Sequence, residues 1–250
     1  MRPSYSNRVC CFVIIEHKNK GAYKTMNHFY QSRDIQFLAD LSDTLELLSV
    51  SLTNPTRELA QALTDGSYFS DLSACITGLS AALDTASLEQ AHAQIAACEV
   101  QFAQEDCEAL YHQINQEFTR LFVSPRRELM PLYESLLVHR GEKKVSMFIN
   151  PSCMHAEQEY RKHGFAFPEK GKTPGDHVAI ELRYVAFLLS SLIGAQVSNN
   201  AQAQQNAKTY LDEFVNAHIQ RWYAAFMDEL AKTTAHPFYL LIAQVGALLK

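Results

Sequence analysis

Residues 173–194 read TPGDHVAIELRYVAFLLSSLIG, and this stretch sets the expectation for the whole fold. The longest apolar run of the sequence begins inside it, at Val185. The run is shorter than the roughly 20 residues that span a bilayer, so it predicts a buried core helix and no transmembrane segment. Pro174, Asp176 and His177 stand directly before this helix. Pro174 is expected to end the preceding loop, Asp176 to cap the helix, and His177 to add a polar group at its entrance.

Apolar residues recur every three or four positions along most of the sequence, and glycine and proline are scarce. This pattern predicts amphipathic helices rather than strands. Thr56 and Asp106 are expected N-caps, and Ser87 with Gln90 is expected to form a capping box. The predicted helices cover approximately residues 35–52, 56–66, 67–83, 87–102, 106–122, 155–163, 176–196, 210–230 and 237–249.

The sequence predicts an all-α fold with about eight to ten helices in one globular domain, residues 26–250. The helical period is lost between residues 124 and 174, apart from one short helix, which predicts a long functional loop. A polar, glutamine-rich link is expected at residues 198–205. Residues 1–25 show no helical period and are expected to be an unstructured extension, so that Met26 is a candidate start.

Charge and cysteine content narrow the classes of function. The net charge of −5 and the absence of a basic stripe argue against a nucleic-acid partner and favour a cationic one. None of the cysteines forms a CxxC pair, so we expect reduced thiols in a cytoplasmic protein and no zinc site. The cysteines are Cys10, Cys11, Cys75, Cys98, Cys107 and Cys153.

Several short motifs suggest chemistry, but their context favours simpler interpretations. GKT at residues 171–173 lacks the earlier glycine and the following helix of a phosphate loop. Glu89 and His92 have the spacing of a di-metal helix pair, but no second pair exists, so a solvated helix face is expected. Because no catalytic signature is present, the chain is predicted not to be an enzyme and to carry no catalytic residue, metal or cofactor.

Two further pairs have ordinary structural interpretations. Glu117 and Arg120 lie three positions apart, and we expect a salt bridge between them on a helix surface. His218 and Trp222 lie one helical turn apart on an aromatic stripe and are expected in the core or at its edge.

Three segments together resemble the signature blocks of the TorD/DmsD family, which are cytoplasmic chaperones of molybdoenzymes. They are EFTRLFVSP at residues 117–125, PLYES at 131–135 and TPGDHVAIEL at 173–182. The sequence of residues 218–249 is similar to the last two helices of that family. One departure is Gly175, at a place where many relatives carry an acidic residue.

This resemblance implies an all-helical protein that binds the twin-arginine signal peptide of a molybdopterin-containing oxidoreductase precursor. Such a chaperone holds its client until the cofactor is inserted and export can follow. The implied binding residues are Tyr133, Glu134 and Ser135 in the second block and Pro174, Asp176 and His177 in the third. Secondary candidates are Glu117, Arg120, His218 and Trp222.

The residue types suit such a peptide. Two guanidinium groups followed by an apolar segment require carboxylates beside a hydrophobic groove, for which Glu134 and Asp176 are the candidate anions. Tyr133 offers a ring on which an arginine can stack. Two alternatives stay open: an assembly chaperone for a non-exported reductase subunit, and a small helical nucleotide-hydrolysing enzyme. The sequence leaves the client, and the choice between monomer and homodimer, undecided.

Overall fold

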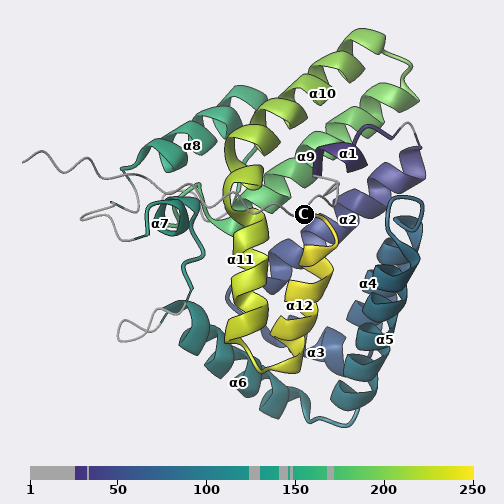
Figure 1. Cartoon of the computed structure of the whole chain (residues 1–250), viewed down its shortest axis with the longest axis vertical. Helices are drawn as coiled ribbons and strands as arrows, with labels where there is room; N and C mark the ends of the chain where they lie inside the picture. Colours follow the sequence, from purple (N-terminus) through teal and green to yellow (C-terminus); the bar gives the residue numbers. More distant parts are fainter. Residues whose placement is uncertain (1–25, 33, 124–129, 141–145, 147–148, 168–171) are drawn as a thin grey trace, which may run out of the picture.

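The computed structural model describes residues 26–32, 34–123, 130–140, 146, 149–167 and 172–250. In these residues the prediction of an all-helical fold with about eight to ten helices is confirmed (Figure 1). The helices of eight residues or more are α2 (Ile35–Ser51), α3 (Arg57–Thr64), α4 (Ser67–Gly78), α5 (Thr85–Phe102), α6 (Cys107–Phe118), α8 (Pro151–His163), α9 (Val178–Val197), α10 (Ala201–Phe214), α11 (Gln220–Thr233) and α12 (Pro237–Ala247).

Helix α9 lies at the centre of the fold, as its apolar sequence predicts. Helix α2 packs along it, and Ser49 of α2 donates a hydrogen bond over 2.8 Å to the backbone oxygen of Ala179. By length and composition α9 would suffice to cross a membrane, but 67% of its most apolar window is buried among the other helices. Its apolar character is therefore accounted for by packing in the core.

The helix starts test the predicted caps. Thr56 and Asp106 cap α3 and α6 as expected, each accepting a hydrogen bond from a backbone N–H three residues later. The predicted capping box at Ser87 is wrong, because the side chain of Asp84 caps α5 and accepts from the N–H of Ser87 over 2.9 Å. Helix α4 also ends earlier than predicted, at Gly78.

A π-helical segment joins α10 to α11. This segment, η2 (Val215–Ile219), lies inside the stripe in which an aromatic or apolar residue recurs every four positions. Such a stripe drifts by about 40° per step around a regular α-helix. The extra residue of a π turn rotates it back toward the core. The predicted polar link before this region is shorter than expected, because α10 already begins at Ala201.

The middle of the chain contains more helix than predicted. Helix α8 begins at Pro151 instead of residue 155, because Asn150 caps it and accepts from the N–H of Cys153 over 2.8 Å. The five-residue helix α7 (Glu134–Val138) was not predicted, since so short a helix has no readable apolar period. The expected N-terminal extension, residues 1–25, lies outside the described residues.

The buried apolar side chains form one continuous core. It extends from Met26, at the start of α1 (Met26–Phe29), to Leu249 after α12. Figure 1 shows α11 and α12 side by side, with α7 and α8 on the other side of α11. The site described next lies where α7, α9 and α11 approach one another.

Candidate functional site

The second and third signature blocks meet through their backbones. Tyr133 and His177 form an isolated antiparallel bridge, and their rings lie edge to face with centroids 5.1 Å apart. The N–H of Glu134 donates to the oxygen of Asp176 over 2.9 Å, and the N–H of Val178 donates to the oxygen of Leu132 over 2.8 Å. The two blocks therefore form one structural unit at the entrance of α9.

The cap predicted for α9 is wrong by one residue. His177 is the N-cap, and its Nδ1 accepts a hydrogen bond over 3.1 Å from the N–H of Ala179. Asp176 instead serves the neighbouring helix, because its Oδ2 accepts from the N–H of Ser135 in α7 over 3.1 Å. Burial, together with the charge of Arg183, lowers the pKa of His177 to about 4. The ring is therefore neutral at pH 7, as an accepting Nδ1 requires.

Behind this junction lies a cluster of buried polar groups, Glu134, Glu181 and His218. His218 Nδ1 lies 2.7 Å from Glu134 Oε2, and the indole N–H of Trp222 donates to Glu181 Oε2 over 3.0 Å. Both carboxyl groups and the imidazole are almost fully buried. The cluster therefore joins α7, α9, η2 and α11 through polar contacts inside the core.

Burial and a nearby arginine limit the negative charge of the two carboxyl groups in this cluster. Burial is the main cause that raises the pKa of Glu181 well above its ordinary value, with the charges of Glu134 and Asp176 adding to it. Burial thus favours the protonated, neutral form of Glu181. Arg221 of α11 places Nη1 2.8 Å from Glu134 Oε1.

Glu134, Glu181 and His218 also bring ligand-type atoms within 4.8 Å of one another, as a metal site would. However, a neutral Glu181 and a guanidinium against Glu134 favour an internally paired cluster, and we assign no ion to it. Sequence reasoning selected Glu134 and His218 but missed Glu181 and Arg221. The one available signal was an acidic residue among the apolar positions of α9.

A path of contacts links the cluster to the surface. The exposed His155 of α8 places Nδ1 2.8 Å from His218 Nε2, and the two rings stack with centroids 5.0 Å apart. Both nitrogens of His218 are thus engaged, one with Glu134 and one with His155.

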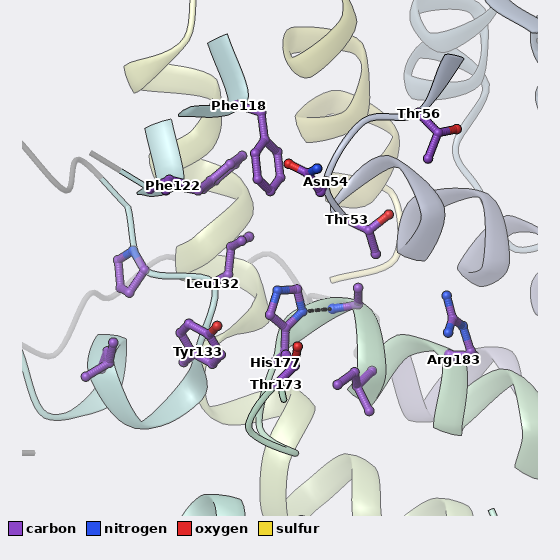
Figure 2. Close-up of a pocket in the computed structure, with 15 residues that line it drawn as sticks. Thr53, Asn54, Thr56, Phe118, Phe122, Leu132, Tyr133, Thr173, His177 and Arg183 are labelled. Carbon is purple, nitrogen blue, oxygen red and sulfur yellow. Dashed lines mark hydrogen bonds between the residues drawn. The ribbon is translucent and has the colours of Figure 1, made fainter. Parts of the chain in front are cut away.

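An open cavity of about 550 Å³ lies beside the junction of the two blocks (Figure 2). Tyr133 and His177 form part of its wall, and α7 and α9 contribute Leu136 and Ile180. The other lining residues are Thr53, Asn54, Thr56, Phe118, Phe122, Val123, Pro131, Leu132, Thr173, Ala179 and Arg183. All three signature blocks therefore contribute to one mostly apolar cavity.

Only some of the residues that the resemblance selected in the second and third blocks line the cavity. Tyr133 and His177 line it, whereas the side chains of Glu134, Ser135 and Asp176 are fully buried in the interior. Pro174 is also buried, in the turn before His177.

The secondary candidates have the structural roles that their spacing predicted. Arg120 makes two N–H contacts of 2.6 Å with the carboxylate of Glu117, which confirms the expected salt bridge. Thr234 also donates to this carboxylate, over 2.7 Å. His218 and Trp222 are buried in the core, as expected.

The turn at Gly175 is closely packed. A Cβ atom at this position would lie 2.6 Å from Cγ of Glu157 on α8. An acidic side chain here would therefore require Glu157 to move. The carboxyl group of Glu157 itself lies next to the turn, where its Oε1 would be 3.5 Å from that Cβ atom.

Comparison with known proteins assigns the chain to a family. A sequence model described as nitrate reductase delta subunit matches residues 79–228, which is more than half of the chain. The chain belongs to the nitrate reductase delta subunit family. The resemblance to TorD/DmsD-type chaperones is thereby confirmed.

Two individual proteins are also similar to this chain. The chaperone protein TorD of Shewanella piezotolerans is 29% identical over 112 residues, which are 45% of this chain and 40% of that protein. The chain thus spans well under half the length of this curated relative. A crystal structure of a candidate redox enzyme maturation protein from Archaeoglobus fulgidus is 18% identical, with a TM-score of 0.44 over 82% of this chain and 91% of that one.

Proposed function

We propose that this chain is a cytoplasmic chaperone that binds the twin-arginine signal peptide of a molybdoenzyme precursor and holds the precursor until its cofactor is inserted. The observation that carries the proposal is the cavity at the meeting point of the three signature blocks. It combines an apolar wall with the half-buried ring of Tyr133 and the ring of His177, which packs against it. In this role the chain performs no catalysis and needs no cofactor.

The cavity suits the apolar part of a signal peptide. Phe118, Phe122 and Leu136 supply an apolar surface, and burying such surface is worth about 25 cal/mol per Å². Tyr133 is half-buried at the wall and can stack against an arginine side chain that enters. Arg183 also lines the cavity, so positive charge is better accommodated toward Tyr133 than toward Arg183.

The candidate anions do not face this cavity directly. Glu134 and Asp176 are fully buried, and each already serves another group of the protein. We therefore assign the apolar segment of the signal to the cavity and expect the arginine contacts outside it. Glu157 is a further anion beside the turn at Gly175, where it is half-buried and pairs with Arg161 over 3.4 Å.

A second candidate function is assembly of a reductase subunit that is not exported. The family description favours it, because it names a subunit of a reductase. Such a chaperone would recognise a client segment without two consecutive arginines. The two functions therefore differ in how strongly binding depends on those arginines.

The binding site can be tested with two substitutions on α7. Leu136 lines the cavity, whereas Val138 lies on the same helix outside it and is 37% exposed. Leu136→Ala removes apolar contact area and should weaken binding of a synthetic twin-arginine signal peptide about fivefold or more. Val138→Ala is the matched control and should bind normally. Equal affinities in calorimetry, with both variants folded, would place the peptide elsewhere.

A further inference from the structure

We propose that Arg221 occupies an arginine subsite at Glu134 and leaves it when an arginine of the client binds. This inference rests on the proposed function, because it requires a client segment that carries arginine. In this proposal Arg221 competes with an arginine of the client for Glu134. Arg221 therefore helps to set the affinity for the client.

The first observation is that a guanidinium already reaches a buried carboxylate from the surface. The Glu134 side chain is fully buried, while the side chain of Arg221 is 44% exposed. Arg221 nevertheless places Nη1 2.8 Å from Glu134 Oε1. The guanidinium of Arg221 therefore fills a passage that leads from the solvent to Glu134. We call this passage the route, and it is wide enough for one guanidinium group.

The second observation is that Arg221 lies close to Glu134 without making a well-aligned hydrogen bond to it. Glu134 Oε1 has no aligned hydrogen-bond donor among the described residues, although Nη1 is close, and Arg221 Nη1 instead donates to the backbone oxygen of Ala217 over 3.4 Å. Arg57 and Arg120 each donate two N–H groups to their carboxylate partners. A guanidinium that aligns an N–H group with Glu134 Oε1 would gain the hydrogen bond that Arg221 lacks.

The third observation is that the subsite is held in place without Arg221. Glu134 Oε2 keeps its 2.7 Å contact with His218, and the backbone N–H of Glu134 is tied to Asp176. The neighbouring Glu181 is expected to be neutral, so it does not add a second negative charge. The carboxyl group of Glu134 is thus presented to whichever guanidinium occupies the route.

When Arg221 competes for the subsite, the apparent affinity for the client equals the intrinsic affinity multiplied by the fraction of molecules in which the subsite is free. Arg221→Gln should therefore bind a synthetic twin-arginine signal peptide about threefold or more tightly than the unmodified protein. A peptide with two lysines should gain less, because an ammonium group does not match the space that a planar guanidinium occupies. In a Glu134→Gln background, Arg221→Gln should have no effect on affinity, since the two changes act on one contact.

Loss of a positive charge alone would also favour a cationic peptide, so a control is needed. Arg140 follows α7 and pairs with Glu229 of α11 at 2.8 and 3.0 Å. Arg140→Gln removes the same charge close to α7 without affecting Glu134. Should Arg221→Gln fail to fold, Arg221→Lys keeps the charge but holds the carboxylate less well, and it should also bind the arginine peptide more tightly.

Calorimetric titration of the full chain separates the outcomes. Tighter arginine-peptide binding by Arg221→Gln than by Arg140→Gln supports the inference. If the unmodified protein binds the peptide and the Arg221 variants bind it no more tightly than Arg140→Gln, the inference is overturned while the proposed function stands. If neither the unmodified protein nor any folded variant binds the peptide, the proposed function fails, and the inference fails with it.

Discussion

The imidazole of His218 lies 2.7 Å from the carboxylate of Glu134, which is 84 positions earlier in the sequence. Neither side chain is accessible to solvent beyond 2%. A buried carboxylate without a donor is costly, so this contact allows Glu134 to stay in the core at the start of α7. The same contact ties the second signature block to the π segment before α11.

Removing His218 should therefore destabilise the protein strongly. His218→Ala leaves Glu134 without this partner and should lower the free energy of unfolding by about 3 to 5 kcal/mol. His155→Ala removes only the exposed partner of His218 and should cost less than about 1 kcal/mol. Urea unfolding of the two variants measures the difference. Similar losses for both would contradict the assigned importance of the Glu134 contact.

Glu181 should make stability depend on pH. Its folded-state pKa is raised by burial, so its contribution is present below the ordinary carboxyl pKa of 4.5 and is lost as pH rises through the raised value. Glu181→Gln keeps an oxygen for the Trp222 indole and cannot ionise. As pH rises above 4.5, where the carboxyl group of the unfolded chain ionises first, the protein should lose stability relative to this variant. Parallel melting curves above that pH would refute a protonated Glu181.

His177 should make stability depend on pH in the direction opposite to Glu181. Its folded pKa is lowered to about 4 from 6.5, so its contribution is present above 6.5 and is lost as pH falls toward 4. His177→Asn retains a capping side chain but has no group that titrates there. The loss of stability of the unmodified protein relative to this variant should reach on the order of 2 to 3 kcal/mol near pH 4. A constant difference in unfolding free energy between pH 7 and 4 would argue against a neutral cap.

Asp176 should stabilise α7 rather than α9. Asp176→Ala removes the acceptor for the Ser135 N–H and should cost roughly 0.5 to 2 kcal/mol, whereas Asp176→Asn should restore most of it. Amide exchange should locate the loss, with faster exchange at Ser135 and unchanged exchange at Ala179. Faster exchange at Ala179 instead would return Asp176 to the cap of α9.

Much of the fold was predictable because its signals are local. The apolar run after Val185 predicted the core helix, and Thr56 and Asp106 cap helices that begin directly after them. The cap of α9 was misplaced because aspartate and histidine stand side by side at its start. The choice between them depends on α7, whose backbone takes the side chain of Asp176.

The candidate site was predictable only in part. The blocks selected Tyr133, Glu134 and His177, which the structure brings together. The roles of Glu181 and Arg221 depend on contacts between helices far apart in the sequence, and no periodic pattern reports those contacts. Burial of Glu134 was equally unpredictable, since a charged residue at a helix start is usually exposed.

In the proposed function, this chain recognises two consecutive arginines of a client signal. Titration of the full chain by calorimetry with a synthetic twin-arginine signal peptide, and with the same peptide carrying two lysines, tests it most directly. We expect binding of the arginine peptide and at least about tenfold weaker binding of the lysine peptide, a difference of roughly 1.4 kcal/mol. Equal affinity for the two peptides would contradict it and would favour a chaperone of a reductase subunit that is not exported.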